Sequence, residues 1–402
     1  MCPDSPATSN PPWHGRLTSA IIKNVKAAAT GVSNGYAPKT LLYGANSSDV
    51  DAIGWAIDEG CTVISQSFHT NSDAVQGTMQ PDDILKDLYA TTRPFTFFSQ
   101  AAGNYFTGDP DGISPIANEY VNHKTYNALS VGNHDDTATN MAGSSVFRNP
   151  ITTNGDRELP EICANGTTVS ALEIVGANGT SFAAPAVAAA AIFLQQLDPT
   201  MKNWPEAIRA ILLCAAGRKI SGNTWWQDVS SLNDVGDGAG CLEVEIARSI
   251  LLNRRDPGNV AGRNGWSIGN LDVKSDFDPK TGRAKYRYNM FAPVEPPLFG
   301  ADPVRNFKVV LAWPSKVIAT GSFPNVTTSS ILTVDLDLEV KDLTTGGIVG
   351  KSRSYDNSFE VVEFKGVAER KYEISILLDS VSNNSQMTWF ALAWRSFTSA
   401  GE

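Results

Sequence analysis

Apolar runs of strand length alternate with amphipathic stretches along the first two-thirds of the chain. Four runs have the composition of short buried strands: 41–44, 62–65, 95–98 and 128–131. Between them, residues 50–57 carry apolar side chains at helical spacing, with Ser48 placed to cap the helix, and 82–89 form a second predicted helix. This alternation predicts an α/β fold in which helices flank a mostly parallel sheet.

Three later segments, 182–197, 205–216 and 242–252, are also predicted to be helical. The first is apolar nearly all round, which is typical of a central helix buried on every side. No apolar run reaches the roughly 20 residues that a membrane-spanning helix needs, so none is expected. Residues 1–6 have neither a basic start nor an apolar stretch, and we expect no signal peptide there.

The hydrophobic period changes in the last third of the chain. Residues 254–270 are rich in Gly, Asn and Arg and are predicted to form a linker or loop. Apolar and polar residues then alternate with a period of two, most clearly over 307–313, 332–340 and 372–376. Successive strands without helices predict an antiparallel, jelly-roll-like β-sandwich. We therefore expect two domains, 1–258 and 259–402.

Composition excludes some classes of partner. The chain of 402 residues is 42% hydrophobic and 18% charged, which suits a large buried core and not a disordered chain. Its formal net charge is −10 and its basic residues form no block, which argues against nucleic-acid binding and against anchoring to an anionic membrane. The sequence does not indicate an oligomeric state.

The cysteines show no CxxC spacing of the metal-binding kind. There are five of them, Cys2, Cys61, Cys163, Cys214 and Cys241. Cys61 opens an apolar strand and Cys214 lies in an apolar helix, so both are predicted to be buried thiols. These residues indicate neither a metal site nor a cofactor required for chemistry.

A serine stands near the start of the central apolar helix, in Asn178-Gly-Thr-Ser-Phe-Ala-Ala-Pro185. There the Ser181 hydroxyl would lie near unpaired N–H groups and the positive end of the helix dipole, which stabilise an attacking alkoxide and a nearby oxyanion. Pro185 is placed in the first turn, where a missing N–H costs little. Alone, the motif is more typical of a helix cap than of a nucleophile.

Two more segments supply complementary chemistry. Asn104 ends Ala101-Ala-Gly-Asn104 after a predicted strand, so its amide projects into the crevice at the carboxyl edge of the sheet and could donate to an oxyanion. His14 begins a helical run and could serve as the general base for Ser181. The other three histidines lie in polar, loop-like contexts and are expected at the surface: His69, His123 and His134.

In their order as well as their content, these segments resemble the subtilisin-like serine peptidases. The matching segments are 14–15 with 20–22, 35–38 with 41–43, 55–57 with 63–67, 101–104, 129–132, 179–185 and 237–240. The resemblance covers roughly residues 13–250 and implies a subtilisin-like fold and hydrolysis of peptide bonds. An α/β-hydrolase esterase is disfavoured, because 179–183 lacks the second glycine of Gly-x-Ser-x-Gly and the histidine precedes the serine.

The resemblance implies a role for each matching residue. Ser181 would attack the scissile carbonyl, His14 would take its proton and pass it to the leaving amine, and Asn104 would hold the oxyanion. Four residues would line the groove and bind the substrate backbone by strand addition: Ser65, Ser67, Ala101 and Gly103. His69 stands where the family usually has a glycine, which leaves the specificity undefined. The implied partner is a polypeptide substrate, and the implied location is extracellular.

The C-terminal domain is similar, more loosely, to the β-sandwich appended to some alkaline subtilisin-like peptidases. In those relatives the domain supports stability and can bind Ca²⁺ as a structural ion. Asp335, Asp337 and Asp356 offer oxygen ligands of the kind Ca²⁺ takes. Alternation along the strand puts Asp335 and Asp337 on a polar face, however, and we predict that this face is solvated.

The catalytic carboxylate of the family has no match. Subtilisin-like peptidases carry it on an early strand, in an Asp-Thr-Gly-like turn some tens of residues before the histidine. Here thirteen residues precede His14, and Asp4 is their only carboxylate. Three explanations stay open. The chain is an active peptidase lacking its N-terminal strand, which we favour; or a non-catalytic relative that binds peptides in the groove; or it receives a carboxylate from elsewhere, even from another chain.

Overall fold

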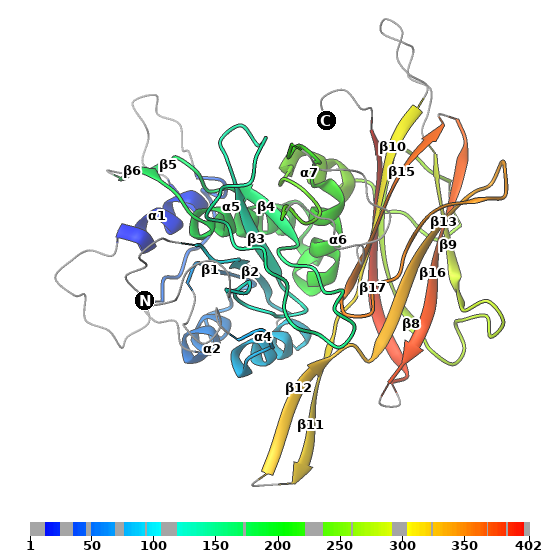
Figure 1. Ribbon diagram of the computed structural model, residues 1–402, viewed down its shortest axis with the longest axis horizontal. Coiled ribbons are helices and arrows are strands. Elements are labelled where there is room, and N and C mark those ends of the chain that lie inside the picture. Colours follow the sequence, from blue (N-terminus) through cyan, green and yellow to red (C-terminus); the bar gives the residue numbers. More distant parts are fainter. Residues whose placement is uncertain are drawn as a thin grey trace, which may run out of the picture.

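The computed structural model places two parts of different architecture side by side, a helix-covered sheet and a pair of antiparallel sheets (Figure 1). It describes residues 13–24, 35–45, 50–68, 76–92, 95–105, 119–171, 174–221, 236–258, 260–291, 304–322, 325–367, 369–382 and 385–397. The predicted α/β fold with a C-terminal antiparallel β-sandwich is confirmed. Asp4, Ser48 and His69, each given a role above, lie outside the described residues.

The sheet of the first part has four parallel strands in the order β1-β2-β3-β4. Their bounds are β1 Val63–Gln66, β2 Phe97–Ala101, β3 Leu129–His134 and β4 Ile162–Asn165. Every residue of β2 and β3 is buried, as parallel strands are when both faces of the sheet are covered. Three of the four predicted strands overlap β1, β2 and β3.

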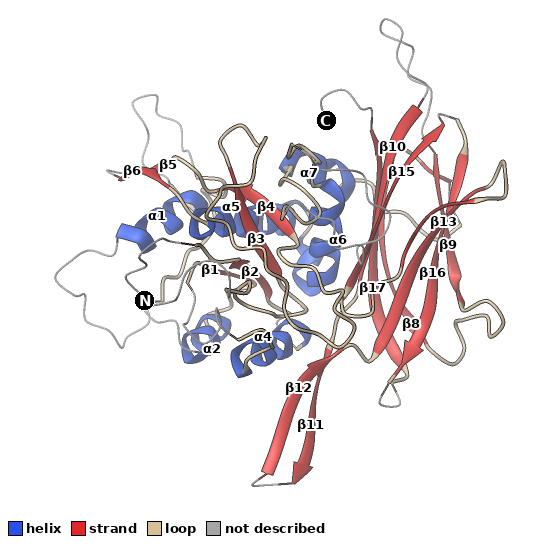
Figure 2. Ribbon diagram, viewed as in Figure 1, coloured by secondary structure: helices blue, strands red, loops and turns tan. Residues whose placement is uncertain are grey.

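Helices cover both faces of this sheet. α2 (Val50–Asp58) and α4 (Pro81–Thr91) lie on one face, and α1 (Trp13–Ile22) and α5 (Thr180–Leu197) lie on the other (Figures 1 and 2). The helices predicted over 50–57 and 82–89 are therefore confirmed. The remaining elements of this part are β5 Val169–Ala171, β6 Ile174–Ala177, the 3₁₀ helix η1 Pro199–Asn203, α6 Pro205–Ala215 and α7 Val244–Leu251.

The central helix α5 is buried along most of its length, as its apolar composition predicts. Among the described helices, it alone is long and apolar enough, by its 18 residues and composition only, to cross a membrane. It packs instead along all four strands of the parallel sheet. α5 is therefore a core helix. Its small alanine side chains between residues 183 and 191 allow the strands to approach it closely.

Three environments differ from those predicted. Residues 41–45 have no regular structure and Leu41 is 79% exposed, so the predicted strand 41–44 is wrong. An apolar run of four residues cannot hold a strand without a partner, and β1 has no strand paired on its outer side in the described part of the sheet. His123 and His134 are buried and not at the surface, since they are only 1% and 7% exposed.

Two antiparallel sheets form the second part. One has the strand order β15-β10-β17-β8 and the other β14-β13-β16-β9-β7, where β7 runs parallel to β9. β11 and β12 form a separate hairpin against α4 (Figure 1). The bounds are β7 Val260–Ala261, β8 Asn264–Asp272, β9 Arg283–Phe291, β10 Val304–Ala312, β11 Lys316–Ser322, β12 Asn325–Ile331, β13 Val334–Asp342, β14 Ile348–Ser352, β15 Phe359–Val367, β16 Lys371–Val381 and β17 Met387–Phe397.

The glycine-rich segment 254–270 is not simply a linker, because β7 and most of β8 lie within it. Two of its glycines, Gly265 and Gly269, leave room for aromatic rings. A Cβ atom added at Gly265 would lie 2.4 Å from the ring of Trp394 in β17. The close approach of that ring, which a single-sequence pattern does not reveal, explains why glycine occurs in the middle of a strand.

The polar face of β13 is buried, so the prediction that it is solvated is wrong. Asp335 and Asp337 are only 6% and 5% exposed. Arg353 Nε lies 3.4 Å from the Asp337 carboxylate, and the carboxylates of Asp156 and Asp356 lie close enough to Asp335 to act on its charge. β13 is a central strand, and its outer face is covered by loops from both parts of the chain.

Buried charges and apolar side chains join the two parts. The Lys308 ammonium of β10 donates to the carbonyl of Ala216 at 3.0 Å and lies 3.1 Å from the Glu363 carboxylate. Leu212 of α6 and Val310 of β10 belong to the same hydrophobic cluster. The predicted domain boundary between residues 258 and 259 falls between α7 and β7, and it stays a prediction because the two parts share this core.

Candidate active site

Ser181 is the second residue of α5 and does not cap the helix. The capping position belongs to Gly179, whose φ of 149° is one that side chains rarely adopt, and which makes no side-chain capping bond. The first N–H groups of a helix have no partner within it, and the positive end of the dipole lies there. The Ser181 hydroxyl therefore stands where negative charge is stabilised.

Pro185 acts on Ser181 in a way that the sequence pattern did not predict. α5 begins at Thr180, so Pro185 lies beyond the first turn, and its missing N–H is the one that would have bonded to the Ser181 carbonyl. The Ser67 hydroxyl donates to that carbonyl instead, at 2.7 Å. In return the Ser181 hydroxyl donates to the Ser67 carbonyl at 3.3 Å. These two bonds join the end of β1 to the start of α5.

Asn104 is held against the start of the same helix. Its Oδ1 accepts from the backbone N–H of Thr180 at 2.8 Å and from the Thr180 hydroxyl at 3.2 Å. These two bonds occupy the carbonyl end of the amide, so the Nδ2 end is left to donate. Among the described residues, neither Asn104 Nδ2 nor the Ser181 N–H bonds to an acceptor, and both lie at the helix N-terminus. Two donors of this kind can receive an oxyanion formed beside Ser181.

His14, the predicted base, contacts Phe182, the residue that follows Ser181. Its ring lies at a tilt to the ring of Phe182, with the centroids 5.4 Å apart, and Trp13 contacts both rings, edge-on to His14. Burial lowers the pKa of His14 below its ordinary value, which favours the neutral imidazole that a base requires. In this geometry the Ser181 hydroxyl bonds to the Ser67 carbonyl and, among the described residues, not to His14.

The predicted substrate-binding residues lie around these groups in different ways. Ser67 contacts Ser181 directly, while Ser65 lies in β1 beside Ser99 of β2. Ala101 is 2% exposed and pairs with Val131 inside the sheet. Gly103 donates to the Thr180 hydroxyl at 3.2 Å and accepts from Val146 N–H at 3.1 Å. The described backbone of Gly103 is thus already bonded, and strand addition there stays a prediction.

A buried polar chain behind β1 was missed by the sequence reasoning. His123 Nε2 donates to the Phe68 carbonyl at 2.8 Å, and the Lys86 ammonium donates to His123 Nδ1 at 3.0 Å. The Lys86 ammonium lies 3.9 Å from the carboxylate of Asp83, which is one turn earlier in α4. These hydrogen bonds fix the position of Phe68, the residue that follows Ser67. The polar contexts of these residues gave no sign that the fold would bury them together.

No described carboxylate supports His14. Burial accounts for the lowered pKa of His14, and none of the described acids acts against it. Asp4, the one upstream carboxylate in the chain, lies outside the described residues. The described part of the site therefore contains the residues predicted as nucleophile, base and oxyanion donor, and no described carboxylate acts on the predicted base.

The proposed Ca²⁺ ligands do not fit one ion as they stand. Asp356 uses its oxygens to accept from the Thr152 hydroxyl at 2.6 Å and from the N–H and side chain of Asn154 at 2.9 and 3.1 Å. Among the described acids, Asp335, Asp337 and Asp356 do not gather their oxygens into one close ligand set. Asp356 instead ties the second part to a loop of the first.

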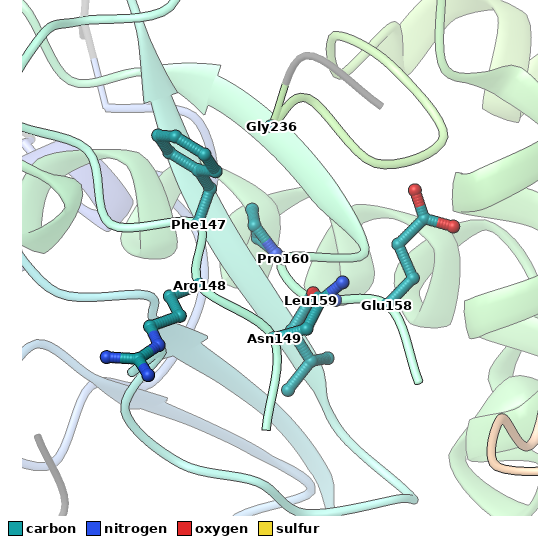
Figure 3. A pocket seen from close by; sticks show the side chains of 7 residues that line it. All are labelled: Phe147, Arg148, Asn149, Glu158, Leu159, Pro160 and Gly236. Atoms are coloured by element: carbon teal, nitrogen blue, oxygen red, sulfur yellow. Dashed lines mark hydrogen bonds between the residues drawn. The ribbon is translucent and has the colours of Figure 1, made fainter. Parts of the chain in front are cut away.

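A surface cavity of about 260 Å³ has a lining that does not include Ser181, Asn104 or His14 (Figure 3). It is lined by Phe147, Arg148, Asn149, Glu158, Leu159, Pro160 and Gly236. In the described structure none of these side chains bonds to Ser181, Asn104 or His14. We therefore do not place the chemistry in this cavity.

A serine at the start of a helix buried against a parallel sheet, with an asparagine amide beside it, defines a subtilisin-like peptidase architecture. A sequence model described as the subtilase family matches residues 3–241, which is more than half of the chain. The chain therefore belongs to the subtilase family, a family of serine peptidases.

Solved structures of proteases resemble this fold. The prenylagaramide maturation protease PagA is 18% identical, with a TM-score of 0.42 over 60% of this chain and 84% of that chain. The patellamide maturation protease PatA is 19% identical, with a TM-score of 0.43 over 60% and 85%. A serine protease of Aeromonas sobria is 13% identical, with a TM-score of 0.45 over 98% and 83%. No curated protein matches the sequence.

Proposed function

We propose that this chain is a serine endopeptidase that hydrolyses peptide bonds through an acyl-enzyme on Ser181. The observation that carries the proposal is the anchoring of Asn104. Its Oδ1 accepts two bonds from Thr180, which leaves its Nδ2 to donate next to the Ser181 N–H. An amide held in this way is preorganised for an oxyanion, and a purely structural serine would not require it.

In the proposed reaction the Ser181 oxygen attacks the scissile carbonyl carbon while His14 takes the hydroxyl proton. The carbonyl oxygen becomes an oxyanion and receives hydrogen bonds from Asn104 Nδ2 and the Ser181 N–H. His14 then gives its proton to the leaving amine, and the carbon–nitrogen bond breaks. Water repeats these steps on the ester, which releases the acid product and restores Ser181.

The substrate in this proposal is a polypeptide that lies along the segment from Ser65 to Phe68. That segment is positioned by Ser181 at Ser67 and by His123 at the next residue, Phe68, so its geometry depends on both bonds. An extended peptide would pair with it as an added strand. An extracellular location is also part of the proposal and is supported by the family resemblance alone.

A second candidate function is supported by a specific observation. The Ser181 hydroxyl bonds to Ser67, and no described acid supports His14. A relative with this arrangement would bind peptides in the groove while cutting them slowly or not at all. It would share the fold and the groove of the active peptidase and would differ in turnover.

Hydrolysis of fluorogenic peptides distinguishes the endopeptidase function from the peptide-binding function. If the endopeptidase proposal is correct, the wild-type chain cuts an internal amide bond, and Ser181→Ala abolishes cutting while peptide binding persists. Peptide binding by the wild type with no more cutting than Ser181→Ala would contradict it and support the binding function. Ser170→Ala, an exposed serine in β5, is a control that should cut as the wild type does.

A further inference from the structure

Three side chains with affinity for soft metal ions meet at the far edge of the parallel sheet. His134 ends β3, Cys163 lies in β4, and Cys241 follows Gly240 shortly before α7. All three are buried, at 7%, 0% and 2% exposed. The function proposed above uses none of them.

The backbone directs these side chains toward one another. Cys163 pairs with Gly132 of β3, and His134 stands two residues further along that strand. Residues two apart in a strand point to the same face, so His134 and Cys163 share a face. On the other side of β4, Cys241 forms a parallel bridge with Cys163, and Leu242 N–H donates to the Cys163 carbonyl at 2.8 Å.

The spacing of the atoms suits a shared ion. The two sulfurs are 3.6 Å apart, and both lie within 4.8 Å of a ring nitrogen of His134. Zn–S bonds of about 2.3 Å at a tetrahedral angle place two sulfurs about 3.8 Å apart. A disulfide would bring the sulfurs to about 2.05 Å. The separation of Cys163 and Cys241 is that of two ligands of one ion.

We propose that Cys163, Cys241 and His134 bind one Zn²⁺ ion. His134 Nδ1 lies 2.7 Å from the Asp135 carbonyl, which can only accept, so Nδ1 carries the proton. Nε2 then offers its lone pair to the ion. Metal-binding histidines commonly have their second nitrogen oriented by a carbonyl in this way.

The surroundings favour a soft ion over a hard one. Ile220 packs directly against the two cysteines, and Met141 and Ala138 lie at the edge of the cluster. Thiolates select Zn²⁺ and other soft ions, whereas Ca²⁺ and Mg²⁺ take oxygen ligands. Three protein ligands leave a tetrahedral ion one further position for water or another ligand.

Binding would connect segments that are distant in the chain. Cys163 and Cys241 are 78 residues apart, and His134 adds a third segment. The Cys241 segment also holds the Ala239 carbonyl, which accepts from Lys308 of β10. Because an ion bound only by the folded state stabilises that state, this site would strengthen the junction between the two parts.

The experiment measures Zn²⁺ on the full chain purified under reducing conditions. The wild type should hold or take up about one Zn²⁺ per chain, with a rise in Tm. Cys163→Ser, Cys241→Ser and His134→Asn should each lower Zn²⁺ affinity at least about tenfold. Cys61→Ser, which alters a half-buried thiol before β1, is the matched control and should bind as the wild type does.

Co²⁺ in place of Zn²⁺ gives a second readout that does not depend on the variants folding. The wild type should show sulfur-to-cobalt charge-transfer absorption, which Zn²⁺ should displace. The proposal is overturned if the reduced wild type takes up no Zn²⁺ or shows no such absorption. A Cys163–Cys241 disulfide in the purified protein, or unchanged Zn²⁺ binding in the double serine variant, would overturn it equally. None of these results bears on Ser181, which the peptide assay tests separately.

Discussion

Ser67 and Ser181 exchange two hydrogen bonds across the junction of β1 and α5. The Ser67 hydroxyl donates to the Ser181 carbonyl at 2.7 Å, and the Ser181 hydroxyl donates to the Ser67 carbonyl at 3.3 Å. Pro185 makes the first bond necessary, since it removes the N–H that the Ser181 carbonyl would otherwise accept. The segment that follows β1 and the start of α5 are therefore positioned by each other.

Replacing Ser67 by alanine should disturb the nucleophile more than the fold. The Ser181 carbonyl would lose its donor, at a cost of about 1–3 kcal/mol if it stays buried. We expect kcat for a peptide substrate to fall roughly tenfold, a loss of about 1.4 kcal/mol in transition-state stabilisation. Ser170→Ala, at an exposed serine of β5, is the control. Equal losses in the two variants would contradict this role for Ser67.

Replacing Asn104 by alanine should remove one oxyanion donor. We expect kcat to fall by about 10²–10³, the size of loss found when serine peptidases lose such a donor, with little change in KM. Thr180→Val should have a smaller effect of the same kind, because Thr180 only holds the Asn104 amide. Thr180→Ser keeps the hydroxyl and should restore kcat. A change in KM alone would show that Asn104 binds substrate and does not serve the transition state.

The pH profile of kcat/KM should report on His14. Burial lowers its pKa below the ordinary value, so the neutral base persists to lower pH. The acid limb of the profile should therefore lie below about pH 6.5, the ordinary histidine pKa. A carboxylate supplied from outside the described residues would favour the protonated ring and move this limb upward. A limb clearly above pH 6.5 would therefore contradict the environment described for His14.

Asp335 should make the protein less stable as the pH rises. Burial, together with repulsion from Asp337, raises the pKa of Asp335 to about 8. An unfolded aspartate ionises near pH 4, so the unfolded state releases a proton that the folded state retains, and stability falls between about pH 4 and pH 8. Asp335→Asn should remove this loss and raise Tm by more at about pH 8 than at about pH 5. Asp51→Asn, at an exposed aspartate of α2 that does not act on Asp335, is the control, and equal shifts at both pH values would refute the assignment.

Periodicity predicted the elements that hold the site. Residues 50–57 and 182–197 show helical patterns strong enough to identify α2 and α5, and the alternation over 332–340 identified β13. Environment was harder to predict. Asp335 lies on the polar side of its strand, as the alternation requires, yet that side is covered by parts of the chain far away in sequence. A pattern gives the direction of a side chain but not what covers it.

The sequence pattern also failed to predict the cluster of metal-binding side chains, because a pattern does not show which distant segments meet. His134, Cys163 and Cys241 come from three separate segments, so no local spacing such as CxxC could indicate them. Pro185 was placed one turn too early because the helix start was set at 182, whereas α5 begins at Thr180. The Ser181, Asn104 and His14 assignments rested on the order of their motifs along the chain. The structure brings Asn104 to Thr180 and His14 to Phe182, the two neighbours of Ser181.

The central claim is that Ser181 is an activated nucleophile. Labelling with a fluorophosphonate probe tests it most directly, because the probe reacts covalently only with a serine that is activated for attack. The account predicts that the wild type is labelled on the peptide containing Ser181, and that Ser181→Ala is not. Wild-type protein labelled no more than Ser181→Ala would contradict it.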